Sequence, residues 1–189
     1  MRREAETLFL ALVKSVTHVE FPTFPWLTNI FDPIDEDIRP IFSALDGDFS
    51  GMNFKSVSKL RPDAYLPALN CILEFDEAQH FTIQRKISLT AYPPGIHLGY
   101  DRQHYISLCQ IHHDSASKKG PPGFRKPTKD FPFSGGRHSQ RALFDSFRDI
   151  LPLRNGLSPT IRISEFDTSH IRNYETKTAR GLVSQLLGL

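Results

Sequence analysis

The segment that most constrains how this chain can fold is Cys71–Asp76, CILEFD, an apolar run that carries two acidic side chains. Residues 63–66 before it form a short strand and residues 67–70 a turn, so the two strands pair as an antiparallel hairpin. Because side chains alternate along a strand, Glu74 and Asp76 share one face with Ile72, while Leu73 and Phe75 point to the other. The chain must therefore bury a strand with one acidic face.

Two carboxylates this close together repel each other, unless a cation lies beside them or one of them takes up a proton. Asp63, at the start of the hairpin, can reach the same point. Ligand sets made only of oxygen favour Mg²⁺ or Mn²⁺ over zinc. The sequence therefore predicts Asp63, Glu74 and Asp76 as metal ligands, and the alternative is a solvated acidic edge of the hairpin.

The pattern of Pro62-Asp63, then Glu74-Phe75-Asp76 and then Gln79-His80 resembles the PD-(D/E)XK nuclease superfamily. It is most similar to the very-short-patch-repair-like branch of small endonucleases, over roughly residues 3–15 and 61–92, and a weaker similarity covers residues 137–164. The resemblance implies an α/β restriction-endonuclease-like fold, in which a three-layer core holds a mixed central sheet flanked by helices. It also implies Mg²⁺- or Mn²⁺-dependent hydrolysis of phosphodiester bonds, in DNA rather than RNA, and a further acidic residue near the start of the first helix, where this chain has Glu6.

This chain departs from the superfamily pattern at two positions. The third motif position is most often Lys in the superfamily but is Asp76 here, as is common in the branch, so the charge that orients water must come from elsewhere. Gln140 and Arg141 are the candidates for this role, and a helix-start surface pair is the alternative. Residue 77 is Glu77 instead of the usual Gly, which adds a fourth carboxylate.

Gln79 and His80 follow the acidic strand and are predicted to orient the water or the phosphate, since an imidazole titrates near neutral pH. A surface histidine that caps the next segment is the alternative. Degenerate members of the superfamily leave a second possibility for the whole chain, namely a non-catalytic module that binds nucleic acid or a partner. A third, a metal-dependent hydrolase of another phosphate ester, predicts no basic surface.

Helical spacing of apolar residues predicts helices over 3–18, 35–45, 82–91, 100–113, 138–151 and 175–187. A strand over 160–166 follows the fifth helix, as a β-α-β crossover requires. In the helix over 138–151 the apolar stripe leaves Asp145, Arg148 and Asp149 to water. In the helix over 82–91, Arg85 is expected either in solvent or in contact with phosphate.

Residues 117–137 are predicted to form a flexible basic loop, with six Lys or Arg from Lys118 to Arg137 against Asp130 alone. Phe124, Phe131 and Phe133 lie between them. Basic and aromatic residues in one loop neutralise phosphates and stack on bases, and a solvated linker stiffened by proline is the alternative. The predicted nucleic-acid contacts are Lys118, Lys119, Arg125, Lys126, Lys129, Arg137 and Arg141.

Length and composition limit the number of domains, the membrane segments and the cysteine chemistry that this chain can have. A chain of 189 residues with 39% hydrophobic content fits a single domain over 1–189. The chain lacks an apolar run of the roughly 20 residues that span a bilayer, which predicts a cytoplasmic protein without a membrane segment. Cys71 and Cys109 are expected as buried thiols, and a zinc site at Cys109, His112 and His113 is disfavoured because one helix supplies two good ligands at most.

Overall fold

The computed structural model describes residues 2–27, 36–50, 60–118, 126–168 and 176–189, which contain six α-helices and three strands. Short 3₁₀ turns lie at Pro25–Leu27, Pro67–Leu69 and Ala78–His80. These elements confirm the predicted mixed α/β class, and each predicted helix and strand has a counterpart. In chain order they are α1 (Arg2–Lys14), α2 (Ile38–Ala44), β1 (Ala64–Leu66), β2 (Cys71–Asp76), α3 (Ile83–Thr90), α4 (Arg102–Lys118), α5 (Gly136–Arg154), β3 (Ile161–Ser164) and α6 (Thr176–Leu187).

The described strands form one mixed sheet in the order β1-β2-β3. β1 pairs antiparallel with β2, with Ala64 opposite Leu73, and β2 pairs parallel with β3, with Leu73 opposite Ile161. Asn70 ends the turn between β1 and β2 at a φ of 50°, a left-handed conformation that asparagine tolerates. A parallel pair needs a long crossover, and the chain passes through α3, α4 and α5 between β2 and β3. The predicted hairpin and the predicted crossover are both confirmed.

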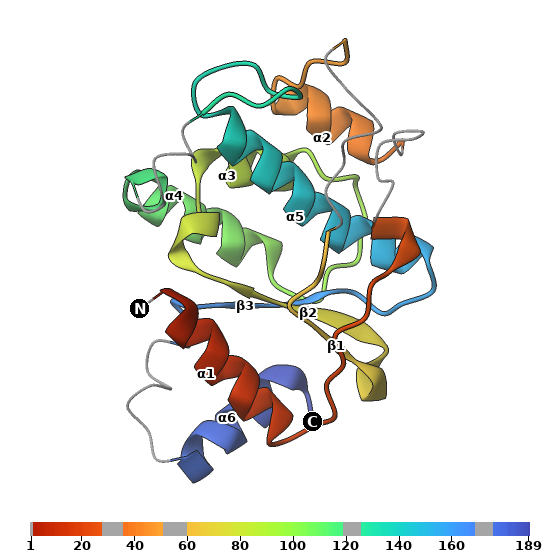
Figure 1. The fold of residues 1–189 in the computed structure, drawn as a ribbon, viewed down its shortest axis with the longest axis vertical. Helices are drawn as coiled ribbons and strands as arrows, with labels where there is room; N and C mark the ends of the chain where they lie inside the picture. The colour runs from red at the N-terminus through yellow and green to blue at the C-terminus, as the bar shows by residue number, and fades with distance from the viewer. Residues whose placement is uncertain (1, 28–35, 51–59, 119–125, 169–175) are drawn as a thin grey trace.

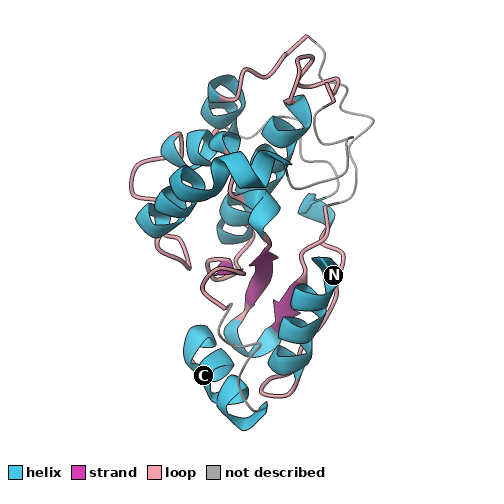
Figure 2. Ribbon diagram, turned by 90° about the vertical axis from the view of Figure 1, so that its left-hand side faces the viewer, coloured by secondary structure: helices cyan, strands magenta, loops and turns pink. Residues whose placement is uncertain are grey.

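Helices cover both faces of the sheet (Figure 1). α1 and α6 contact each other on one face, whereas α3, α4 and α5 lie on the other, and the two layers are also separate in Figure 2. α2 contacts α5 on the side away from the sheet (Figure 1). The alternation of side chains along β2 matches these layers. Leu73 and Phe75 join the apolar cluster of α1 and α6, in which the Phe9 and Phe75 rings stack at 5.0 Å. Glu74 and Asp76 point the other way, toward Arg148 and Asp145 of α5.

Helix α5 is buried on more than one side, so the prediction that Asp145, Arg148 and Asp149 face water is wrong. Its apolar stripe lies in the core as expected, but Asp145 and Asp149 are also buried, at 0% and 1% exposure, and the Arg148 side chain is only 16% exposed. The reason is that α5 packs against α2, α3 and β2 at once. A helix enclosed in this way must pair its polar side chains inside the protein, because it cannot direct them to water.

The predicted flexible loop over 117–137 is divided in the structure. Lys118 ends α4, and Arg137 lies in the first turn of α5. That helix starts at Gly136, where a Cβ atom would meet the Phe131 carbonyl oxygen at 2.0 Å, so only glycine fits. Lys119 and Arg125 lie outside the described residues. Within the described part of the chain, none of the helices combines the length and the apolar character needed to cross a membrane.

Candidate functional site

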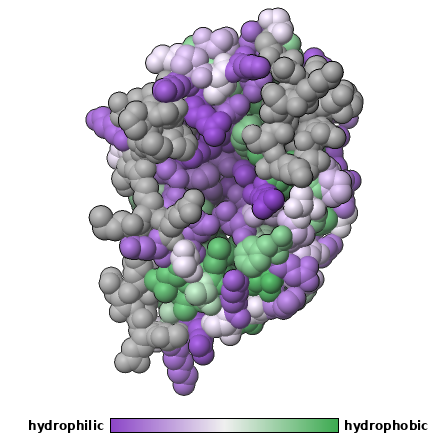
Figure 3. Space-filling view, in the orientation of Figure 1, coloured by the Kyte–Doolittle hydropathy of each residue, from purple (hydrophilic) through white to green (hydrophobic). Residues whose placement is uncertain are grey.

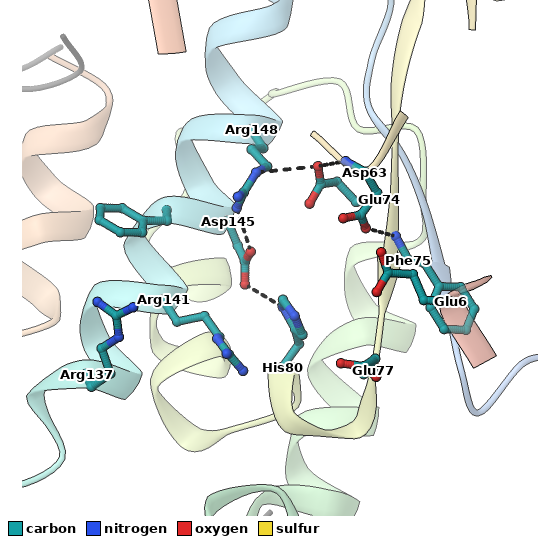
Figure 4. A pocket seen from close by; sticks show the side chains of 11 residues that line it. Glu6, Asp63, Glu74, Phe75, Glu77, His80, Arg137, Arg141, Asp145 and Arg148 are labelled. Atoms are coloured by element: carbon teal, nitrogen blue, oxygen red, sulfur yellow. Dashed lines mark hydrogen bonds and ion pairs between the residues drawn. The ribbon is translucent and has the colours of Figure 1, made fainter. Parts of the chain in front are cut away.

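A pocket of about 270 Å³ lies between α5 and the β1-β2 hairpin. On the face drawn in Figure 3, hydrophilic side chains gather around a hollow near the centre. The close view shows acidic side chains on one wall of the pocket and arginines of α5 on the other (Figure 4). The pocket is lined by Glu6, Asp63, Glu74, Phe75, Glu77, His80, Arg137, Arg141, Phe144, Asp145 and Arg148.

The register of the hairpin brings Asp63 and Glu74 together. Ala64 is paired with Leu73, so Asp63 stands opposite Glu74, where Cβ atoms of an antiparallel pair are typically about 4.5–5.5 Å apart. The backbone N–H of Asp63 donates to Glu74 Oε1 at 3.3 Å, and the N–H of Phe75 donates to Asp63 Oδ2 at 2.8 Å. These hydrogen bonds hold both carboxyl groups at the wall of the pocket.

Both of these carboxyl groups are hard to ionise in the protein alone. Burial raises the pKa of Glu74 well above its ordinary value, and the negative charge of Asp63 adds to the effect, against the opposing charge of Arg148. Burial also raises the pKa of Asp63, and Glu6 contributes in the same direction. The two groups therefore lie where negative charge lacks full compensation.

Glu6 and Glu77 complete the acidic wall. Glu6 is half-buried on α1, and its carboxylate points toward the same space as those of Asp63 and Glu74 (Figure 4). Glu77 follows β2, and its Oε2 accepts a hydrogen bond from the Gln79 side-chain amide at 2.7 Å. The Gln79 amide is thereby directed at Glu77, and Gln79 does not line the pocket.

The opposite wall is a stripe along α5. Arg137, Arg141, Phe144 and Arg148 are spaced by four, three and four residues, so they share one face of the helix. Arg148 is the innermost, with its Nε 3.4 Å from Glu74 Oε1 and its Nη1 3.4 Å from Asp145 Oδ1. Burial lowers the pKa of Arg141, whose Nη1 reaches the Gln79 carbonyl oxygen at 3.5 Å.

His80 lies at the floor of the pocket, between two buried carboxylates. Its Nδ1 is 3.3 Å from Asp76 Oδ1 and 3.1 Å from Asp145 Oδ2. Both neighbours are acceptors, so Nδ1 carries the proton in this arrangement, and Nε2 is the ring atom left to act in the pocket. Burial opposes ionisation of Asp145, but His80 and Arg162 outweigh it and hold the pKa of Asp145 well below its ordinary value.

A buried ion network lies behind His80. Arg162 of β3 is inaccessible to solvent; its Nη1 donates to both oxygens of Asp76, at 2.8 and 2.9 Å, and its Nε donates to Asp149 Oδ1 at 2.6 Å. Asp149 Oδ2 also accepts from Arg85 Nη2 at 2.8 Å. Arg85 is 2% exposed and serves this network, so the expectation that it lies in solvent or contacts phosphate is wrong. It is held inside because Asp149 and the hydroxyl groups of Tyr92 and Tyr100 satisfy it.

Asp76, His80 and Asp145 form a group that could hold a metal ion. Each offers one ligand atom, and these atoms lie within 4.8 Å of one another. The nitrogen in this set suits a transition-metal ion better than Mg²⁺, which prefers oxygen ligands.

The structure brings together seven of the residues that the sequence suggested for the site, and it separates others from them. Asp76 lies behind the pocket on Arg162, and Gln140 turns away, since its Nε2 donates to Asp130 at 3.1 Å and its Oε1 accepts from Arg137. Lys118, Lys126 and Lys129 are exposed but do not line the pocket. The seven residues brought together are Glu6, Asp63, Glu74, Glu77, His80, Arg137 and Arg141.

Sequence reasoning did not place Phe75, Phe144, Asp145 and Arg148 in the pocket. A signal for the last two was present, because Arg141, Asp145 and Arg148 recur at helical spacing as charges of alternating sign. That pattern is also typical of a solvated helix face, the environment predicted for Asp145 and Arg148.

Comparison of this chain with protein-family models, with curated proteins and with solved structures found no match in any of the three.

Proposed function

We propose that this chain is a metal-dependent nuclease that hydrolyses phosphodiester bonds of DNA, with a restriction-endonuclease-like core of the PD-(D/E)XK type. The observation that carries the proposal is the pocket itself, in which Asp63 and Glu74 face the arginine stripe of α5. A phosphodiester needs cationic groups to bind its oxygens, and its hydrolysis needs an activated water. The arginine wall supplies the cationic groups, and the acidic wall supplies carboxylates that would hold a water-activating metal ion.

Asp63 and Glu74 would hold one Mg²⁺ or Mn²⁺ ion, with Glu6 beside them. The fit is supported by the raised pKa values of Asp63 and Glu74, since a divalent cation would supply the positive charge that both carboxylates need. All the donor atoms are carboxylate oxygens, the ligands that these two ions prefer. When bound, such an ion lowers the pKa of a coordinated water and offsets negative charge on the phosphate.

The remaining residues would bind the substrate and move a proton. Arg137 and Arg141 reach the pocket from α5 and would bind the phosphate oxygens, while the exposed Lys126 and Lys129 would contact the backbone further along. His80 Nε2 would exchange a proton with the attacking water or the leaving oxygen. In this scheme Asp76 orients His80 through Nδ1, 3.3 Å away, instead of binding the ion.

One observation favours a second candidate, a non-catalytic module that binds nucleic acid through the same arginines. Both oxygens of Asp76 are held by Arg162, and the Lys that the superfamily most often carries at this position is missing. A chain that had lost catalysis could keep this internal pair. It would bind DNA without cleaving it.

Cleavage of supercoiled plasmid and of single-stranded DNA in Mg²⁺ or Mn²⁺ separates the two candidates. We expect cleavage that EDTA abolishes and that Asp63→Asn and Glu74→Gln each reduce by at least about a hundredfold. The matched control is Asp114→Asn, which removes a carboxylate that is 85% exposed on α4 and should leave the rate unchanged. Salt-sensitive binding without cleavage in either metal would favour the non-catalytic module. Undiminished cleavage in both site variants would rule out the active site described above.

A further inference from the structure

The buried acids near the pocket fall into two sets that differ in how their charge is compensated. One set is Asp76, Asp145 and Asp149, all at or below 2% exposure. Their partners are Arg85, Arg162 and the Nδ1–H of His80, at distances of 2.6–3.3 Å, and Asp145 also lies 3.4 Å from Arg148 Nη1. This set therefore pairs three carboxylates with two guanidinium groups and the Nδ1–H of His80 at short distances.

Arg162 stands where an ion chelated by Asp76 would stand. Its Nη1 is 2.8 Å from one oxygen of Asp76 and 2.9 Å from the other. Its Nη2 donates to the Asp145 carbonyl oxygen at 3.0 Å and lies 3.8 Å from Asp145 Oδ1. One guanidinium therefore joins the two carboxylates that would have to share a metal ion with His80.

The second set, at the pocket, is Asp63 and Glu74. Among the ion pairs of the described residues, the cation in contact with this set is Arg148, 3.4 Å from Glu74 Oε1, and Arg148 also serves Asp145. Two carboxylates against one shared guanidinium leave an excess of negative charge that a divalent ion would offset. The raised pKa values of Asp63 and Glu74 agree with this excess.

We infer that the chain binds a single divalent ion, at Asp63 and Glu74, and that the Arg162 guanidinium replaces a second ion beside Asp76. The close group of Asp76, His80 and Asp145 then stays free of metal, although its ligand atoms are near enough to one another. A second divalent ion there would face the positive charge of Arg162 directly, and it would have to displace the proton from His80 Nδ1. The inference rests on the metal site of the proposed function, but not on its nuclease activity.

Titration with Mn²⁺, followed by the electron paramagnetic resonance signal of the free ion, tests the inference on the full chain without any substrate. We expect one bound Mn²⁺ per chain. Asp63→Asn should weaken binding by at least about tenfold, whereas His80→Asn should change the affinity by less than about twofold. Asp114→Asn, on the exposed face of α4, is the control for loss of a carboxylate.

A second variant tests the role of Arg162 itself. Arg162→Met removes the internal cation, and we expect it to gain a second Mn²⁺ that the double change Arg162→Met with His80→Asn loses again. If Arg162→Met does not fold, the wild-type and His80→Asn titrations decide by themselves, because both leave the buried guanidinium in place.

The outcomes separate this inference from the proposed function. Two ions in the wild type, one ion that depends on His80, or no bound Mn²⁺ would each overturn the inference. One ion that depends on Asp63, in a chain that cleaves no nucleic acid, would support the inference and reject the nuclease. Cleavage by a chain with two bound ions would support the nuclease and reject the inference of a single ion.

Discussion

Glu74 is 3% exposed, and within the described part of the chain its contacts with donors are the Asp63 backbone N–H at 3.3 Å and Arg148 Nε at 3.4 Å. A buried carboxylate with such long contacts recovers only part of the hydration energy that it loses. Asp76, two residues later on the same face, makes contacts of 2.8 and 2.9 Å to a buried guanidinium. The difference between these two residues is why the metal is assigned to Glu74, while Asp76 is assigned to the internal network.

At the scale of this residue, Glu74→Gln should stabilise the metal-free protein at neutral pH. Because burial raises the pKa of Glu74 in the folded state, its contribution to stability is present below the ordinary value of about 4.3 and is lost as the pH rises toward the folded value. The free energy of unfolding of Glu74→Gln should exceed that of the wild type by at least about 1 kcal/mol at pH 8 and converge with it near pH 4.

Urea unfolding in EDTA at several pH values measures this difference. Glu36→Gln is the matched control, because the Glu36 side chain is 87% exposed and the same change there should have no pH-dependent effect. If Glu74→Gln and the wild type were equally stable at every pH, ionisation of Glu74 would not lower the stability of the folded protein.

At the scale of the element, α5 organises the site. Its arginine stripe lines the pocket, and the buried Asp149 connects it to α3 through Arg85 and to β3 through Arg162. The sequence predicted the helix and its apolar stripe correctly. It could not predict the second buried face, because charges at helical spacing look the same whether they meet water or arginines from other elements.

Asp149→Ala should therefore cost about 3–5 kcal/mol, because it leaves two buried guanidinium groups without their shared partner. Asp149 accepts from Arg85 at 2.8 Å, from Arg162 at 2.6 Å and from two tyrosine hydroxyls. Burial works against its charge, but Arg162 and Arg85 keep its pKa below the ordinary value. The stabilisation is therefore present above about pH 4 and is lost only in stronger acid.

Urea unfolding at pH 7 measures the loss, and the same substitution at the exposed Asp114 should stay within about 0.5 kcal/mol of the wild type. A loss below about 1 kcal/mol for Asp149→Ala would mean that the two arginines find other partners.

The arginine stripe of α5 leads to a separate prediction about binding. Arg137→Gln should weaken binding to DNA and lower the slope of log affinity against log salt by about 0.7–1, since each lost phosphate contact releases one counterion fewer. Arg154→Gln is a control on the same helix, because Arg154 pairs with Asp37 and Glu36 and does not line the pocket. Fluorescence anisotropy in EDTA at several salt concentrations gives both quantities. Equal slopes for the two variants would exclude Arg137 from the binding surface.

At the scale of the whole molecule, local patterns predicted more than long-range partners. The alternation in CILEFD predicted that Leu73 and Phe75 lie on the face opposite to Glu74 and Asp76, and the predicted hairpin allowed Asp63 to reach Glu74. The place of Arg162 could not be predicted. It alternates with Ile161 and Ile163 as a solvated strand residue would, and its burial depends on Asp149 and Asp76, which are 13 and 86 residues away. Such pairings follow from the packing of α5 on the sheet, for which the sequence has no local signal.

The same layered arrangement would make binding of the proposed ion depend on more than one layer of the fold. Glu6 belongs to the layer of α1 and α6, whereas Glu74 lies in β2 and Asp63 directly precedes β1, so an ion held by all three would connect the helix layer to the sheet. A ligand that binds only the folded state at 100 times its Kd adds about 2.7 kcal/mol. For a chain of this length, that corresponds to a rise in Tm of roughly 5–10 °C.

We therefore expect Mn²⁺ to raise the Tm over that in EDTA by about this amount, in the wild type and in the control Asp114→Asn, but not in Asp63→Asn. Glu6→Gln should retain only part of the shift, because it removes the charge that α1 contributes. Hydrogen exchange shows whether the ion connects α1 to the sheet or stabilises only the hairpin. The amides of α1 should gain protection with Mn²⁺ in the wild type, and this gain should be absent in Glu6→Gln. A Tm that rises equally in Asp63→Asn would place the ion elsewhere in the molecule.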